Sequence, residues 1–216
     1  MIYKSALHPF ISIGEHDHGF LQDLNKDSKR ELKVNIASGG SNGAEDVYIY
    51  SIDSAVVLIN ALDGMNKVMP RFRDIDRDSI PEIIFNDNLF LCWHTGCAGS
   101  PRPPLIWRWD GERYRLANFK YKDHILNGHN NDPVELRKRI SSYVETYSFR
   151  KGYDPYPPAL WKAMLQQIYA GNSNVADSIF NNFWPPELSD KNEFYLEFIN
   201  HLHNGPYWEE LQQSDW

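Results

Sequence analysis

Two stretches of this chain carry oxygen-bearing side chains at the same four positions, 1, 3, 5 and 9 of a loop. The matching pairs are Asp23 with Asp74, Asn25 with Asp76, Asp27 with Asp78, and Glu31 with Glu82, at a constant offset of 51 residues (74 − 23). Carboxylate, amide and carbonyl oxygens are the ligands that Ca²⁺ takes in proteins. The spacing therefore predicts a calcium site in each loop, with the backbone carbonyl at position 7, Lys29 or Ile80, as a further ligand.

These loops are not EF-hands, which need Gly at position 6 and an acidic residue at position 12. Position 6 is Ser28 or Ser79 here, and position 12 lies in an apolar stretch. An ion ligated on all sides has no open position for a substrate, so we expect a structural role. Ligand charge predicts tighter binding in the second loop, which has four carboxylates against three. The alternative interpretation is a pair of Asx-turns, in which the short polar side chains only cap their own backbone.

The elements that must position the loops are expected to be strands. Apolar and polar residues alternate directly after each loop, and β-branched and aromatic residues are frequent throughout this part of the chain. The expected strands are Leu32–Ile36, Val47–Tyr50, Ala55–Ile59, Glu82–Phe85, Leu89–Trp93, Leu105–Trp109 and Arg113–Leu116. Asp110-Gly111 between the last two is a strong hairpin signal. Tyr50–Asp53 matches Trp107–Asp110 at an offset of 57 residues (110 − 53), so the repeat extends from loop through hairpin.

The two loops resemble the calcium loops of FG-GAP or VCBS-type repeats, which occur in integrin-like β-propeller blades and in many bacterial secreted proteins. The pattern of that family is Asp-x-Asp/Asn-x-Asp-Gly-x-x-Asp/Glu followed by a strand, and both loops here have Ser in place of the Gly. The resemblance covers roughly residues 19–53 and 70–110. It implies two propeller-blade-like antiparallel β repeats, bound calcium, and a periplasmic or secreted location. Two repeats are too few to close a propeller, which takes at least about four blades.

From about residue 120 the apolar residues recur at helical spacing. We expect helices over about 133–147, 160–169, 175–183 and 189–204, the first behind the capping pair Asp132-Pro133. The linker is expected at Lys120–Asp132. The sequence thus predicts an α+β fold with a β module over residues 1–119 and an α-helical subdomain over residues 120–216.

Bulk composition excludes several classes of function. The 216 residues carry 22 basic and 29 acidic side chains, a net charge of −7, which argues against a nucleic-acid partner. No apolar stretch approaches the roughly 20 residues of a membrane span. The N-terminal segment has no uninterrupted apolar core, so we expect no signal peptide in this chain.

Histidines and cysteines leave other chemistry open. His16 and His18 flank Asp17 beside the first loop and could form half of a transition-metal site, with a third ligand from His94, His124 or His129. Cys92 and Cys97 could form a loop disulfide or remain two buried thiols. The chain contains no nucleophile elbow, zincin motif, Walker loop or dinucleotide fingerprint, so its status as an enzyme stays open.

The favoured interpretation is a non-enzymatic, calcium-stabilised module that binds a protein or glycan. One alternative is a metal-dependent hydrolase that uses His16, His18 and nearby carboxylates. Another is an intracellular interaction or inhibitor protein with metal-free loops.

Overall fold

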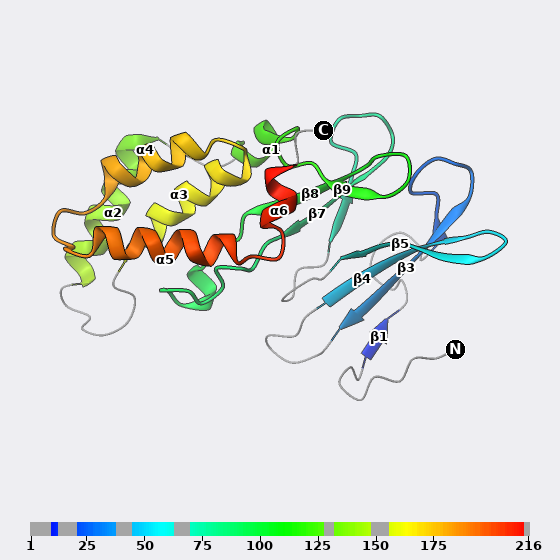
Figure 1. The fold of residues 1–216 in the computed structure, drawn as a ribbon, viewed down its shortest axis with the longest axis horizontal. Helices are drawn as coiled ribbons and strands as arrows, with labels where there is room; N and C mark the ends of the chain where they lie inside the picture. The colour runs from blue at the N-terminus through cyan, green and yellow to red at the C-terminus, as the bar shows by residue number, and fades with distance from the viewer. Residues whose placement is uncertain are drawn as a thin grey trace. The chain divides into compact units, whose positions relative to one another are not determined.

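The computed structural model describes residues 10–12, 21–37, 45–62, 70–127, 132–147 and 156–213. Strands come first along the chain and helices follow, which confirms the predicted α+β class (Figure 1). The chain forms two compact units. We call Met1–Asn86 with Ile106–Leu116 the β unit, and Asp87–Leu105 with Ala117–Trp216 the helical unit. The segment Asp87–Leu105, which chain order places in the β module, thus clusters with the helices.

The first antiparallel sheet of the β unit has the order β1-β3-β4-β5, and β2 also pairs with β3. Its strands are β1 Phe10–Ser12, β2 Leu21–Gln22, β3 Arg30–Ala37, β4 Glu45–Ile52 and β5 Val56–Leu62. Val47 and Ile49 of β4 are buried, as the alternation predicts. The edge strand β5 differs, because Val56, Val57 and Leu58 are 65, 57 and 48% exposed.

The second sheet of the β unit has the order β6-β7-β8-β9. Its strands are β6 Arg71–Arg73, β7 Glu82–Asn86, β8 Pro104–Trp109 and β9 Tyr114–Leu116. Phe85 of β7 stacks on Trp107 of β8 with ring centroids 4.4 Å apart. The predicted hairpin joins β8 and β9: the Asp110 side chain accepts two backbone N–H groups of the turn, and Gly111 has a φ of 107°.

The expected strand at Leu89–Trp93 is wrong, because this segment forms turns in the helical unit. The Asp87 carboxylate accepts the Leu89 N–H at 2.8 Å, and the N–H of Leu91 donates to the carbonyl of Asn88. Cys92 then has a φ of 59°, which no strand residue adopts. An Asp side chain that captures a backbone N–H two residues on favours a turn over a strand ladder.

The predicted helices are confirmed, and two short ones are added at either end of the helical region. The helices are α1 Lys122–Leu126, α2 Pro133–Tyr147, α3 Pro158–Tyr169, α4 Ser173–Phe183, α5 Lys191–His203 and α6 Trp208–Gln212, with a 3₁₀ turn η1 at Cys97–Gly99. Asp132 caps α2 by accepting the Val134 N–H at 2.9 Å. Among the described helices, none combines the length and apolar character that crossing a bilayer requires.

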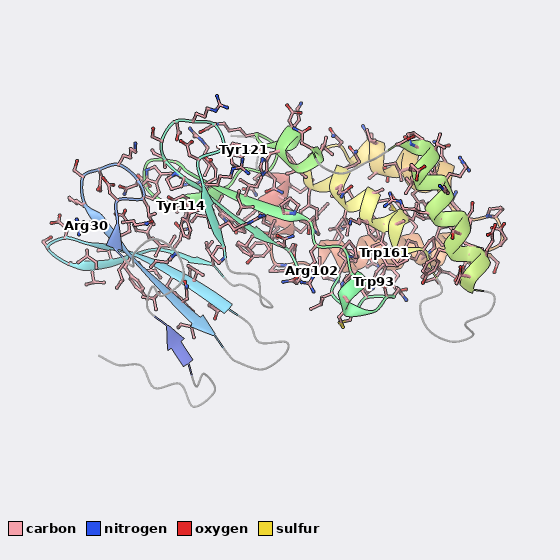
Figure 2. All side chains as sticks on the ribbon, turned by 180° about the vertical axis from the view of Figure 1, so that it is seen from behind. Arg30, Trp93, Arg102, Tyr114, Tyr121 and Trp161 are labelled. Carbon is pink, nitrogen blue, oxygen red and sulfur yellow. A yellow bond between two sulfur atoms is a disulfide. The ribbon has the colours of Figure 1, made fainter. Side chains whose placement is uncertain are left out.

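Aromatic rings form the core of the helical unit. Phe194 and Phe198 of α5 and Trp161 of α3 are completely buried, and Trp93 reaches them from the turn segment (Figure 2). The Trp93 and Trp161 rings meet edge to face, 5.6 Å apart. Offset and edge-to-face ring pairs add roughly 0.5–1.5 kcal/mol each beyond the burial of their area.

A buried polar group joins the turn segment to α3 within the helical unit. The Tyr169 hydroxyl donates to Asp87 at 2.6 Å, and Asp87 is only 3% exposed. Burial raises the pKa of Asp87, and it raises the pKa of Tyr169 well above its usual value, so Tyr169 stays a neutral donor. Asn118 completes the connection by donating to the carbonyls of Pro104 and Tyr169.

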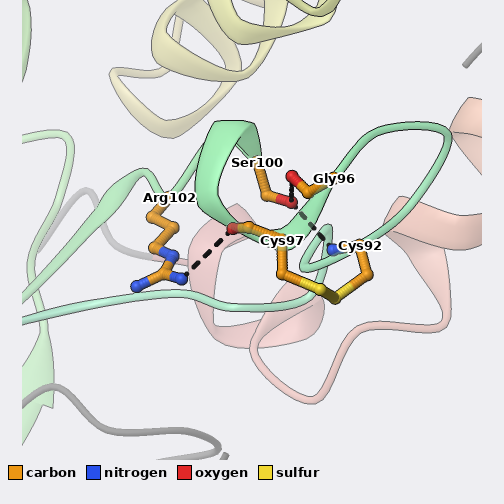
Figure 3. The surroundings of a disulfide bond; sticks show 5 residues. All are labelled: Cys92, Gly96, Cys97, Ser100 and Arg102. Carbon is orange, nitrogen blue, oxygen red and sulfur yellow. Dashed lines mark hydrogen bonds between the residues drawn. A yellow bond between two sulfur atoms is a disulfide. The ribbon is translucent and has the colours of Figure 1, made fainter.

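The structure settles the state of the two cysteines, which form a disulfide (Figure 3). Ser100 braces this loop by accepting the Cys92 N–H at 2.8 Å, and its hydroxyl donates to the Gly96 carbonyl. Arg102 donates to the Cys97 carbonyl from the other side. The bridge therefore closes the turn that carries Trp93 into the aromatic core.

Tyr169→Phe tests the Asp87 contact. It leaves a buried carboxyl group short of one donor, so the free energy of unfolding of the helical unit should fall by about 1–3 kcal/mol. Tyr195→Phe is the matched control, because the Tyr195 hydroxyl donates to Asp177 at an exposed site. Urea unfolding followed by Trp fluorescence measures both. Equal effects of the two changes would show that burial of Asp87 adds nothing.

Reduction of the disulfide should destabilise the helical unit moderately. Only five residue positions separate the cysteines, so the loop-closure model gives a loss of about 2 kcal/mol. Urea unfolding with and without a dithiol reductant measures it, and the double variant Cys92→Ser/Cys97→Ser serves as the control for the reductant. Two comparisons decide: the unaltered protein with and without reductant, and the unaltered protein against the double variant. If the urea midpoint is the same in both, the bridge has no stabilising role.

Candidate metal sites

The two acidic loops have the same backbone conformation. Positions 4 and 6 of each loop have positive φ: 61° and 69° at Lys26 and Ser28, and 64° and 74° at Arg77 and Ser79. A left-handed conformation costs a non-glycine residue about 1–2 kcal/mol. This explains why the resembling family has Gly at position 6, and it shows that both loops fold in this way with Ser instead.

The loop backbone and the acidic side chains are also bonded in the same pattern. At each loop the position-1 carboxylate accepts the N–H of position 6, and the position-5 carboxylate accepts the N–H of position 7. The bonds are Ser28 to Asp23 at 3.1 Å, Ser79 to Asp74 at 2.9 Å, Lys29 to Asp27 at 2.8 Å and Ile80 to Asp78 at 2.8 Å. These are the contacts of the Asx-turn interpretation. They are compatible with metal binding, because each carboxylate has a second oxygen.

The two glutamates at position 9 close the loops from the strands. The Leu24 N–H donates to Oε2 of Glu31 and the Ile75 N–H to Oε2 of Glu82, both at 2.7 Å. Glu31 and Glu82 are each only 1% exposed. Oε1 of Glu31 has no hydrogen-bond partner among the described residues. Burial raises the pKa of Glu31, and the nearby charges of Asp27 and Asp23 raise it further, although the Leu24 N–H opposes them.

In the second loop, Asp74, Asp76 and Asp78 each place one carboxylate oxygen within 4.8 Å of the others. Calcium holds its oxygen ligands at about 2.3–2.6 Å, so ligands on opposite sides of one ion lie up to about 5 Å apart. The exposed triad could therefore hold a metal ion. Across the described parts of the chain, no other group of three His, Cys, Asp or Glu side chains meets so closely. In the first loop position 3 is the neutral Asn25, whose side-chain oxygen accepts the Asp27 N–H at 3.0 Å.

Arg108 on β8 is a part of the second site that the loop motif does not reveal. Its guanidinium lies 3.5 Å from Oδ2 of Asp76 and 3.4 Å from Oδ2 of Asp78. The residue at the same place in the first repeat is Ser51, at the offset of 57 residues. Four carboxylates and one arginine give the second site a formal charge of −3 (−4 + 1), equal to that of the three carboxylates of the first. The extra carboxylate is expected to make the second loop bind calcium more tightly, and the charge of Arg108 cancels this advantage.

The remaining expected ligands are Lys29 at position 7 of the first loop, the histidines and the two cysteines. The Lys29 ammonium pairs with Asp53 at 2.6 Å at an exposed site, and this contact raises the pKa of Lys29. His94 pairs with Glu197 at 2.9 Å in the helical unit, and the two cysteines offer no thiolate because they are bridged. His16, His18 and His129 lie outside the described residues.

No protein-family model, curated protein or solved structure matches this chain. The case for a metal site therefore depends on the geometry of the loops.

Arg108→Gln tests whether the arginine competes with a cation. Without the guanidinium, calcium binding at the second loop should tighten by up to about fivefold, since surface ion pairs contribute about 0.2–1 kcal/mol. In the metal-free protein the same change should lower the melting temperature, because the carboxylates lose their counter-charge. Arg115→Gln removes a charge that pairs with Asp110 instead, and it is the matched control. Calorimetric titration decides, and an equal effect of both variants would contradict competition.

Proposed function

We propose that this protein is a non-enzymatic binding module whose β unit is stabilised by calcium in the acidic loops. The observation that carries the proposal is the convergence of Asp74, Asp76 and Asp78 on one point. Three carboxylates held this close repel one another, and a divalent cation among them removes the repulsion. Oxygen ligands in an exposed, irregular loop suit calcium better than magnesium, which demands a tight octahedron.

The loops are placed where an ion would act on structure. Each loop ends at the first residues of a strand inside its sheet: β3 pairs with β1, β2 and β4, and β7 lies between β6 and β8. An ion that fixes the loop also fixes the start of that strand. The calcium of this proposal therefore has a structural role.

A protein or glycan is the partner we propose. The exposed apolar residues Val56, Val57 and Leu58 on the edge strand β5 support a protein partner, since an edge strand has backbone groups available for pairing. The resemblance to secreted calcium-loop repeats supports an extracytoplasmic location, and the disulfide agrees with an oxidising compartment.

One observation favours a second candidate, an interaction protein with metal-free loops. Arg108 already supplies a positive charge to Asp76 and Asp78. If the arginine is sufficient, the loops need no ion and serve as Asx-turns. Elemental analysis of the purified protein separates these functions: calcium supports the first and absence of metal the second, whereas zinc or manganese would favour a hydrolase.

Calcium should raise the melting temperature of metal-free protein. At a calcium concentration about 100-fold above Kd, binding to the folded state alone adds about 2.7 kcal/mol, or about 5–10 °C for a chain of this size. Magnesium should give a smaller rise. Differential scanning calorimetry in EDTA, calcium and magnesium measures it. Coincident curves in EDTA and calcium would sink the proposal.

Three variants locate the effect within the β unit. Asp76→Ala should remove most of the calcium-dependent rise, because it takes one member of the converged triad, and Asn25→Ala should remove less. Glu112→Gln, at the exposed hairpin turn, removes a carboxylate outside both loops and should leave the rise unchanged. If Asn25→Ala abolishes the rise and Asp76→Ala spares it, the first loop is the principal site.

A further inference from the structure

Tyr114 of the second repeat reaches back to the acidic loop of the first. It lies on β9, and its hydroxyl donates to the Leu24 carbonyl at 3.1 Å, although 90 residues separate the two along the chain. Both residues are buried, at 2% and 3% exposure. Leu24 is position 2 of the first loop, and its N–H donates to Glu31. A single residue thus connects the Tyr114 hydroxyl to the glutamate that closes the loop.

The main chain of Tyr114 is fixed by the first repeat as well. Asn60 of β5 uses both ends of its amide: Nδ2 donates to the Tyr114 carbonyl at 2.8 Å, and Oδ1 accepts the Tyr114 N–H at 2.7 Å. The phenol therefore has little freedom to move away from Leu24. Figure 2 labels Tyr114 on its strand in the β unit.

This contact belongs to one repeat only. The residue that matches Tyr114 in the first repeat is Val57, at the offset of 57 residues, and it is 57% exposed and has no hydroxyl. Tyr114 is therefore not a general requirement of the repeat. It is specific to the junction at which the second repeat meets the first loop.

A second observation concerns the glutamate that closes the first loop. Glu31 is 1% exposed, and its Oε1 has no partner within the described ranges of the chain. Its other oxygen, Oε2, accepts the N–H of Leu24 at position 2, so this carboxyl group lies against its own loop. A buried carboxylate oxygen without a donor is costly unless a cation or proton satisfies it.

We propose that Tyr114 is a positioning residue for the Asp23 loop: its hydroxyl holds Leu24, Leu24 holds Glu31, and Glu31 is thereby set to ligate calcium. The inference rests on the proposed function. It follows that the first loop depends on the second repeat, because β9 supplies the hydroxyl.

The test isolates the first loop. In an Asp76→Ala background, which disables the second loop, calcium titration by calorimetry measures the Kd of the first. Adding Tyr114→Phe should weaken this Kd about tenfold, the order of one buried hydrogen bond. Tyr50→Phe removes another hydroxyl from the same unit and should leave Kd unchanged. Asp23→Ala in the same background should abolish binding, which assigns the signal to the first loop.

The readouts separate positioning from plain stabilisation. A lower melting temperature in EDTA with an unchanged Kd would make Tyr114 merely structural and overturn the proposal. If Tyr114→Phe does not fold, Asn60→Ser replaces it. That change frees the Tyr114 main chain and keeps the hydroxyl, so Kd should weaken several-fold, and a constant Kd again overturns the proposal.

Failure of this inference differs from failure of the proposed function. If the unaltered protein binds no calcium, the proposed function fails and this inference with it. If the unaltered protein binds one ion and the Asp76→Ala variant none, the second loop is the calcium site. In that case the inference about the first loop fails and the proposed function stands.

Discussion

In both acidic loops, backbone N–H groups donate hydrogen bonds to the carboxylates and so fix their positions. The rest of each sheet depends on this interaction. Each loop turns twice through left-handed backbone, and this aims its amides at its own carboxylates. The closing glutamates then enter the buried interior next to the strands that carry them. β3 and β7 start at these loops and pair with strands on both sides. A distorted loop would therefore displace the start of its strand and disturb the pairing of the whole sheet.

The two repeats offset this charge in different ways. In the second repeat Arg108 lies beside Asp76 and Asp78, so it reduces the repulsion among the carboxylates of that loop. The first has no such cation at the matching place, and its lysine pairs with Asp53 outside the loop. Its closing glutamate has instead an oxygen with no donor in the described structure. One loop thus has a counter-charge within its own repeat, and the other relies on its surroundings.

The sequence predicts what is local. Ligand spacing locates both loops, alternation locates most strands, and apolar periodicity with the Asp132 cap locates the long helices. Leu89–Trp93 fails because its composition suits a strand, whereas the Asp87 side chain, held by Tyr169 from 82 residues away, favours a turn. Arg108 and Tyr114 could not be assigned to the loops beforehand, since their contacts depend on the register and packing of strands. The cysteine spacing permits a bridge without requiring it.

The helical unit is assembled from two distant parts of the chain, and this affects when it can fold. The turn segment leaves the ribosome about 100 residues before α5, yet its contacts lie there: His94 pairs with Glu197 and His201 with the Leu89 carbonyl, across 103 and 112 residues. Closing such long loops is slow, because chain entropy is lost before the contacts form. During synthesis Phe90 and Trp93 leave the ribosome well before α5, whose rings they contact in the folded unit. The nascent chain is most open to chaperones and to misfolding in this interval.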